Sequence, residues 1–413
     1  MSGLHPQGPQ PVVCVSRFFQ RLVFVISLSV IAALGFGYLL GQFGWFGVHA
    51  GSEQDGAYRQ MRVYAEVLKK IQTDYVTTPS MRDVTDGALH GLLNSLDPDS
   101  SYLSATEYKI YKEHPASGDA QVGITLSKRF GSAAVVSVVP GSPADKAHLS
   151  DGDVIESIDN QSTFELSLTL ARMMLEGKPG TTVTLSVFRP FKTDPDKVTL
   201  TRTVTTLPAI GEEQYENSSI LYLKPGVLTA ERVSEIAAKL KADGKGRKIL
   251  LDLRDSTGDD PQQGIRLANF FIKQGTLATL QGQKVTQQTF TADPALCITD
   301  APLAVLVNRG TYGPAEITAA AIGDAKRGDV VGEHTFGEDS VQKTIELPDG
   351  GALLLTVAKY QSPSGNKIQD NTVAPTVAVD QTSDEDQFAP AAASKTDAIL
   401  DKGLALLKAK TAS

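Results

Sequence analysis

The spacing of apolar residues changes along the chain and marks its segments. Residues 22–40 run for nineteen positions without a charge, which is long enough for a helix to cross a bilayer. Residues 57–115 predict a small helical domain, because their apolar side chains recur at helical spacing: Tyr64, Val67, Leu68 and Ile71, then Leu89, Leu92, Leu93 and Leu96.

Residues 116–207 follow a different pattern, in which short β runs alternate with turns. Residues 208–380 alternate buried apolar strands, as at 248–254, with helical segments, and this alternation predicts an α/β core around a mixed sheet. Residues 381–413 combine a polar, Ala- and Pro-rich linker with an amphipathic helix at 398–408. The predicted fold class is therefore an α/β multidomain protein with a membrane helix, a helical domain, a β-rich domain containing two helices, and an α/β core.

Composition supports a multidomain protein and argues against nucleic acid as its partner. The chain has 413 residues, of which 41% are hydrophobic and 21% charged, so it is long enough for two or three domains. Its net charge of -8 argues against a nucleic-acid binder, which would carry a basic face. The two cysteines, Cys14 and Cys297, lie on either side of the predicted membrane helix, so no disulfide is expected.

Basic residues orient the predicted membrane helix. Arg17 and Arg21 precede the apolar run, and positive residues stay on the cytoplasmic side of a membrane. We therefore expect a cytoplasmic tail at 1–21, a single-pass anchor at 22–48, and the rest of the chain outside the cytoplasm, in the periplasm of a cell with two membranes. The alternative is a long signal peptide, cleaved after the small-x-small sequence at 48–50.

Several motifs resemble those of one protease family. Residues 96–103, LDPDSSYL, are similar to L-D-P-H-S-x-Y-[LM] with Asp99 in the histidine position. Residues 359–369, KYQSPSGNKIQ, are similar to Y-x-x-P-S-G-x-x-I-Q. Together with residues 302–349 they resemble the carboxyl-terminal processing, or tail-specific, serine proteases. The resemblance extends over about 57–408 and implies a protease-like α/β core at 208–380.

Both catalytic side chains of that family are missing. Its nucleophile is the middle serine of S-A-S-A-S-E-I, and its base is the lysine of F-G-K-G-[ST]-V-Q, twenty-five positions later. These positions hold Gly313 and Glu338, whereas the glutamine that follows the lysine is kept as Gln342. Since glycine has no atom that attacks a carbonyl, the resemblance implies a serine-type peptidase scaffold without proteolysis. No cofactor or metal is expected.

The turn that would stabilise the oxyanion has also changed. The family motif L-D-L-R-x-N-P-G-G places two glycines where backbone N–H groups approach the scissile carbonyl. Here the first glycine is Gly258 and the second is replaced by Asp259. A carboxylate at this point opposes the negative charge that the turn would stabilise.

Residues 116–207 resemble a PDZ domain. The turn 151–155, DGDVI, and the segment 177–180, GKPG, belong to this resemblance. A PDZ domain adds an extended chain end as a strand, while N–H groups of a glycine-containing loop receive its carboxylate. That loop would be Val122, Gly123 and Ile124. We therefore expect the ligand to bind within 116–207 and not in the vacated protease site.

The leading hypothesis is a membrane-anchored, extracytoplasmic pseudoprotease that binds protein C-termini. One alternative is an active endopeptidase with a rebuilt site, formed by Thr311, Tyr312 or Ser340 together with His334. Another is a structural adaptor that associates with an active protease homologue. A cation site formed by the carboxylates of Asp259, Asp260, Glu338 and Asp339 is a further alternative.

Overall fold

A computed structural model describes residues 53–114, 120–129, 131–164, 166–189, 192–204, 206–379 and 397–410. The predicted anchor at 22–48, with its alternative cleavage site, lies outside these ranges. Among the residues described, no helix combines the length and the apolar character that crossing a bilayer requires.

The chain forms two units, which divide after Met81. The described part of the first unit contains one long helix, α2 (Glu53–Asp74). Several of its apolar side chains are exposed, among them Tyr58, Met61, Val63 and Val67. Everything described below belongs to the second unit.

The second unit starts with helices and a short strand. Helix α3 (Met81–Asn94) is followed by β1 (Ser101–Leu103) and α4 (Ala105–Glu113). Helix α4 begins with a capping box, in which Ser104 accepts from the N–H of Glu107 and Glu107 accepts from the N–H of Ser104. The helical pattern did not predict β1, which pairs antiparallel with β16 more than two hundred residues later.

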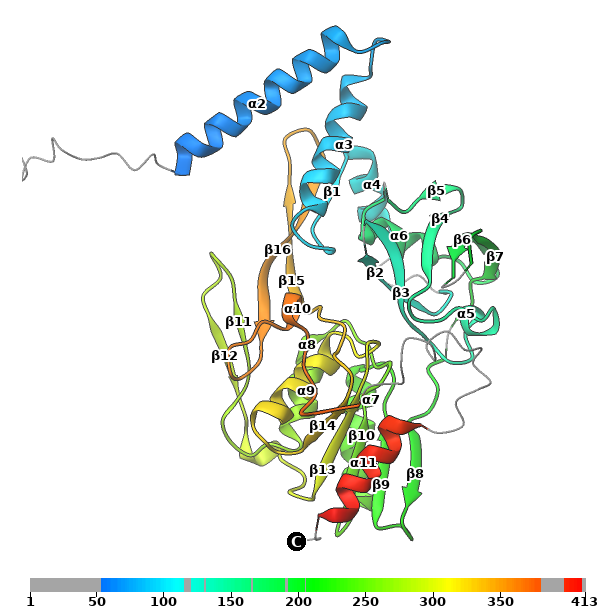
Figure 1. Cartoon of the computed structure of the whole chain (residues 1–413), viewed down its shortest axis with the longest axis vertical. Helices are drawn as coiled ribbons and strands as arrows, with labels where there is room; N and C mark the ends of the chain where they lie inside the picture. Colours follow the sequence, from blue (N-terminus) through cyan, green and yellow to red (C-terminus); the bar gives the residue numbers. More distant parts are fainter. Residues whose placement is uncertain are drawn as a thin grey trace, which may run out of the picture. The chain divides into compact units, whose positions relative to one another are not determined.

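Residues 120–204, which we call the groove domain, form an antiparallel sheet with two helices (Figure 1). The strand order is β2-β3-β4-β6-β7, so β2 lies at an edge. The elements are β2 (Ile124–Arg129), β3 (Ser132–Val138), α5 (Pro143–Lys146), β4 (Val154–Ile158), β5 (Gln161–Ser162), α6 (Leu168–Leu175), β6 (Thr182–Phe188) and β7 (Asp196–Thr201). In β6, alternate side chains enter the core, as the period of two in a half-buried strand predicts.

The α/β core predicted from strand-helix alternation is confirmed. Its sheet has the order β17-β14-β13-β10-β9-β8, parallel except for β8. The strands are β8 (Gly211–Tyr215), β9 (Ile220–Lys224), β10 (Lys248–Asp252), β13 (Leu303–Val307), β14 (Asp329–Gly332) and β17 (Val377–Ala378). The central strands are continuous apolar runs because both faces of the sheet are covered.

Each face of this sheet has its own layer of helices. Helices α7 (Ala230–Asp243), α8 (Pro261–Asn269) and α9 (Pro314–Asp324) pack on one face, with core residues such as Leu251 and Val305. Helix α11 (Ala398–Ala409), drawn in red in Figure 1, packs on the other face against residues such as Leu250 and Leu306.

A third sheet is built around the long strand β16 (Ala352–Gln361). It pairs with β15 (Ser340–Glu346) along most of its length, with β1 near its start, and with β11 (Thr276–Gln281) near its end. Strand β12 (Gln288–Thr291) completes the sheet, and η1 (Pro294–Leu296) and α10 (Ile368–Asn371) lie in the connections. Because β1 pairs with β16, residues 96–103 lie near the loops that follow β13 and β14.

Candidate functional site

A sharp strand-to-helix turn carries the predicted nucleophile position. Strand β13 is fully buried and leads through residues 308–313 into α9. Gly313 is the N-cap of α9 with φ 59° and ψ −123°, and Pro314 occupies the first helical turn. A nucleophilic serine sits on a strained turn of this kind in serine hydrolases. The backbone of such an elbow is therefore present, and the side chain that would react is absent.

Glu316 holds this elbow to the loop that carries the predicted base position. Its buried carboxylate accepts N–H groups from Gly313 at 3.1 Å, Gly337 at 2.7 Å and Glu338 at 3.0 Å, together with the hydroxyl of Thr335. Burial raises the pKa of Glu316 to about 7, although the four donated hydrogen bonds favour its carboxylate form. The two segments that would carry the catalytic groups are thus fixed to each other by a carboxylate that is still in place.

Glu338, at the lysine position, turns toward the groove domain. Its side chain is only 3% exposed, and its Oε2 accepts the hydroxyl of Ser127 on β2 at 2.6 Å. Burial raises the pKa of Glu338 well above its ordinary value, and the neighbouring Asp99 raises it further. Glu338 thus holds the position of the family's lysine with a buried carboxyl that bonds Ser127 of the groove domain.

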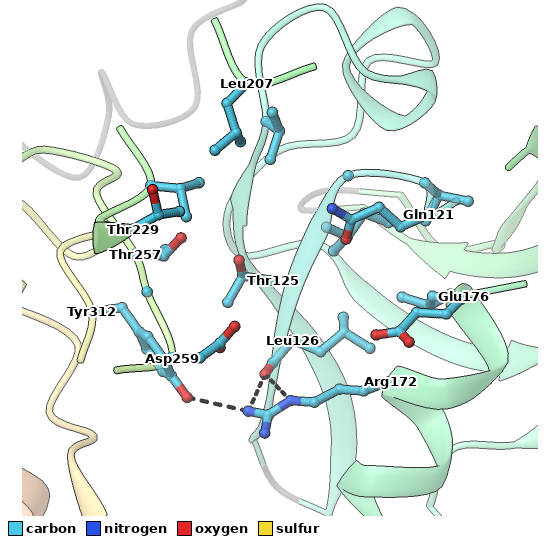
Figure 2. A pocket seen from close by; sticks show the side chains of 17 residues that line it. Gln121, Thr125, Leu126, Arg172, Glu176, Leu207, Thr229, Thr257, Asp259 and Tyr312 are labelled. Carbon is cyan, nitrogen blue, oxygen red and sulfur yellow. Dashed lines mark hydrogen bonds between the residues drawn. The ribbon is translucent and has the colours of Figure 1, made fainter. Parts of the chain in front are cut away.

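Arg172, on α6 of the groove domain, contacts both domains. Its guanidinium donates to the carbonyl of Leu126 at 2.8 Å and to the hydroxyl of Tyr312 at 3.1 Å (Figure 2). It also lies 3.5 Å from the carboxylate of Asp99 and 3.9 Å from that of Glu338. The histidine and lysine positions of the protease motifs are thus both acidic, and one arginine from the other domain pairs with them.

The loop predicted to receive a carboxylate and the altered oxyanion turn line one cavity of about 390 Å³ (Figure 2). Val122, Gly123 and Ile124 form part of its wall in the groove domain, and residues 257–259 and Tyr312 form its wall in the core. The loop predicted within 116–207 therefore faces residues of the core across one cavity.

The loop formed by Val122, Gly123 and Ile124, which we call the receptor loop, has a conformation that requires glycine at its centre. Gly123 has φ 82°, and a Cβ on it would lie 2.3 Å from the Cβ of Ser142, so only glycine fits there. Strand β2, which follows, has one edge paired with β3 and the other edge open. An open strand edge is suited to adding a peptide strand.

The oxyanion turn keeps its backbone connections but presents a carboxylate. The carbonyl of Thr257 accepts the N–H of Leu228 at 2.7 Å, and the carbonyl of Ser256 accepts the N–H of Tyr312 at 2.9 Å. Asp259 is exposed on the cavity wall. Negative charge here would repel the oxyanion of a tetrahedral intermediate.

The hydroxyl and imidazole candidates for a rebuilt catalytic site bond to different partners. Thr311 is fully buried and donates its hydroxyl to the carbonyl of Leu253 at 2.9 Å. Ser340 donates to Asp99 at 3.3 Å, and the imidazole of His334 hydrogen-bonds to Thr372 at 2.9 Å. These three side chains therefore have separate partners, and no hydroxyl–imidazole pair is formed among them.

The four candidate cation ligands are divided between two environments. Glu338 and Asp339 are buried, whereas Asp259 and Asp260 are exposed. Asp260 caps α8 by accepting the N–H of Gln262 at 3.0 Å. Across the described ranges, no group of three or more histidine, cysteine or acidic side chains is placed to hold a metal ion.

Sequence reasoning missed the two residues that connect the domains. Ser127 and Arg172 lie 211 and 166 positions before Glu338, and neither belongs to a motif that would indicate the contact. Gln342, which keeps the glutamine of the family motif, is exposed on β15.

Comparison with known proteins agrees with this two-domain arrangement. The sequence model of peptidase family S41 matches residues 213–379, and that of the PDZ domain matches residues 120–205. The carboxy-terminal-processing protease of Bartonella bacilliformis is 29% identical over 337 residues, which cover 80% of this chain and 77% of that protein. The carboxyl-terminal-processing protease of Synechocystis is 31% identical over 324 residues, which cover 75% of each chain.

A solved structure extends the likeness to three dimensions. The photosystem II D1 C-terminal processing protease superposes with a TM-score of 0.63 at 25% identity. The match covers 76% of this chain and 86% of that one. The groove domain, which we call the PDZ domain from here on, and the α/β core therefore both have counterparts of known architecture.

Proposed function

This chain belongs to peptidase family S41, the carboxyl-terminal-processing proteases, and we propose that it is a non-proteolytic member that binds the C-terminal ends of other proteins. The single observation that carries the proposal is one cavity that is lined both by the glycine-containing loop 122–124 and by Tyr312, the residue before Gly313. Gly313 supplies no attacking atom, and the loop around Gly123 keeps its glycine conformation and its open strand edge.

Loss of proteolysis is supported by three changes in different parts of the site. The nucleophile position is Gly313, the base position is Glu338, and the oxyanion turn ends in Asp259. Each change alone would remove a step of acyl transfer, since attack, proton transfer and charge stabilisation need separate groups. The contacts of Glu338 with Ser127 and Arg172 give that position a structural role instead.

The proposal includes a location. The uncharged run at 22–40, preceded by Arg17 and Arg21, supports a single-pass anchor with the PDZ domain and the core outside the cytoplasm. An anchored binder would hold captured chain ends at the membrane surface. There it could present them to an active protease homologue, or keep them from one.

The first test compares two peptides that differ only at their C-terminus. The full-length chain in detergent micelles should bind a peptide with an apolar last residue and a free carboxylate, measured by calorimetry. Amidation should weaken binding by on the order of 1.5–3 kcal/mol, the usual strength of hydrogen bonds to a charged group. Equal affinity of the acid and the amide would place the ligand elsewhere, and absence of binding to both would reject the proposed function.

The same protein should leave unstructured substrates intact. Incubation with casein and with the peptide ligand, followed by mass spectrometry, should show no new termini. Cleavage that survives repurification and disappears in Thr311→Ala or Ser340→Ala would establish an active enzyme in place of the binder proposed here.

A further inference from the structure

Three charged side chains line the cavity shared by the PDZ domain and the core, and two of them already have partners. Arg172 is bound to Leu126, Tyr312 and Asp99. Glu176 lies 3.1 Å from the imidazole of His114. Their charges are therefore engaged within the protein before any ligand arrives.

Asp259 is the third charged residue, and its situation differs. Within the described part of the chain, no hydrogen bond or ion pair joins its side chain to another residue. Figure 2 shows it on the core wall, with its carboxylate pointing into the cavity toward β2. A carboxylate in a concave, partly enclosed site attracts a positive group more strongly than one on an open surface.

The length of the added strand is limited by Arg172. The partner of Leu126 on β3 is Val135, whose N–H donates instead to Asp153 on the far side, at 2.8 Å. The carbonyl of Leu126 therefore points to the open edge of β2, where the guanidinium of Arg172 already occupies it. A peptide that pairs with β2 finds only the portion around Ile124 and Thr125 unoccupied, so its last two or three residues would pair.

Strand alternation then decides which side chain faces the core. When the terminal carboxylate lies at the loop around Gly123, the last side chain points into the groove between β2 and α6. The penultimate side chain points the opposite way. The core wall, with residues 257–259 and Tyr312, borders the same cavity.

We infer that Asp259 selects protein C-termini with lysine or arginine at the penultimate position, by pairing its carboxylate with that side chain. This inference rests on the proposed function, because it assigns the ligand class of the same cavity. It also gives the aspartate that replaced a glycine of the oxyanion turn a role in recognition.

The experiment uses the full-length chain in detergent micelles and fluorescence anisotropy of labelled decapeptides. The peptides share one apolar last residue and differ only at the penultimate position, which is lysine, glutamine or glutamate. We expect lysine to bind about fivefold more tightly than glutamine, as for a partly exposed ion pair, and glutamate to bind more weakly than glutamine. High salt should reduce these differences.

Variants assign the effect to one carboxylate. Asp259→Asn should abolish the preference for lysine and Asp259→Lys should reverse it, with the preference measured as the ratio of the affinities for the lysine and glutamine peptides. Asp243→Asn is the matched control, because Asp243 ends α7 and does not line the cavity. It should keep the wild-type preference.

The outcomes separate this inference from the proposed function. If the lysine and glutamine peptides bind equally while amidation still weakens both, the inference is wrong and the binding function stands. A preference that appears only when lysine is moved to the fourth position from the end also overturns it. Absence of binding to every peptide rejects both.

Discussion

The receptor loop at Gly123 and the elbow at Gly313 both use a glycine at positive φ, at 82° and 59°. At the loop the missing side chain is a steric requirement, since a Cβ would lie 2.3 Å from Ser142. At the elbow a Cβ would meet only the carbonyl of Gly258, at 3.1 Å, which a shift of a few tenths of an ångström relieves. The first glycine is needed to build its site, whereas the second leaves nearly enough room for a serine.

This difference separates two kinds of chemistry. Peptide binding in a PDZ groove depends on backbone N–H groups and on a strand edge, which persist as long as the fold persists. Proteolysis depends on particular side chains, which are lost by single substitutions without harm to the fold. Glu316 illustrates the second point, because it holds the elbow and the 335–338 loop together although the family's serine and lysine positions on them are Gly313 and Glu338.

The largest effect is expected from a substitution in the receptor loop, which leaves the elbow unchanged. Gly123→Ala should lower the free energy of unfolding by about 3 kcal/mol, of which ~1 kcal/mol comes from the left-handed backbone and the rest from the clash with Ser142. Peptide affinity should fall more than tenfold. Thermal unfolding and anisotropy measure the two effects.

Gly180→Ala is the control for this prediction. Gly180 has the same φ of 82°, but a Cβ there would meet nothing within 4 Å. It should therefore show only the backbone cost of ~1 kcal/mol and leave peptide binding unchanged. Equal losses in the two variants would mean that the contact with Ser142 is easily relieved.

The next effect concerns the buried acids behind the elbow. Asp339 is 5% exposed and its Oδ2 has no hydrogen-bond partner within the described residues. Burial raises its pKa well above the ordinary value, and the negative charges of Glu316 and Asp99 add to the shift. The folded protein therefore binds more protons than the unfolded chain once the pH exceeds the unfolded carboxyl pKa of about 4. Stability should fall as the pH rises from that point toward the raised pKa.

Asp339→Asn tests this pH dependence. The variant should be more stable than wild type at pH 8 by about 1–3 kcal/mol, because its amide takes up no proton on folding, and nearly equal to it at pH 4. Denaturant unfolding at several pH values measures the difference. Glu316→Gln should instead be destabilised throughout, since an amide cannot accept all four donated hydrogen bonds. A variant at position 339 that loses stability at pH 8 would contradict this account.

The smallest expected effect concerns the catalytic positions, where restoring both residue types should produce no activity. Gly313→Ser combined with Glu338→Lys restores both catalytic residue types, yet it should not cleave casein or react with a fluorophosphonate probe. A lysine at 338 would lie beside Asp99, whose negative charge favours the protonated ammonium. Serine labelling that appears at neutral pH in the double variant and not in Gly313→Ser alone would show that the site still lowers the pKa of the lysine.

Local motifs predicted the α/β core, the receptor loop and the positions of the lost catalytic groups, because each depends on neighbours in sequence. Gly313 and Glu338 could be assigned from two short segments, and the elbow geometry followed from a strand, a glycine and Pro314. Val122, Gly123 and Ile124 were likewise found by their loop and line the cavity.

Contacts between the domains could not be predicted in the same way. Arg172 reads in the sequence as one charge on an amphipathic helix, and its partners Asp99 and Tyr312 lie 73 and 140 positions away. Nothing local distinguishes it from a solvated arginine. The sharing of one cavity by the receptor loop and the oxyanion turn depends on domain packing, which hydrophobic periodicity does not encode.

The pairing of β1 with β16 bears on how the chain folds. Ser101 pairs with Leu354, so the segment that carries Asp99 must wait for a partner about 250 residues later. Closing so large a loop is entropically costly and slows folding. During synthesis, residues 96–103 would leave the ribosome early and remain unpaired until β16 emerged. The ion pair between Asp99 and Arg172 would therefore be among the last contacts to form, after the PDZ domain had folded on its own.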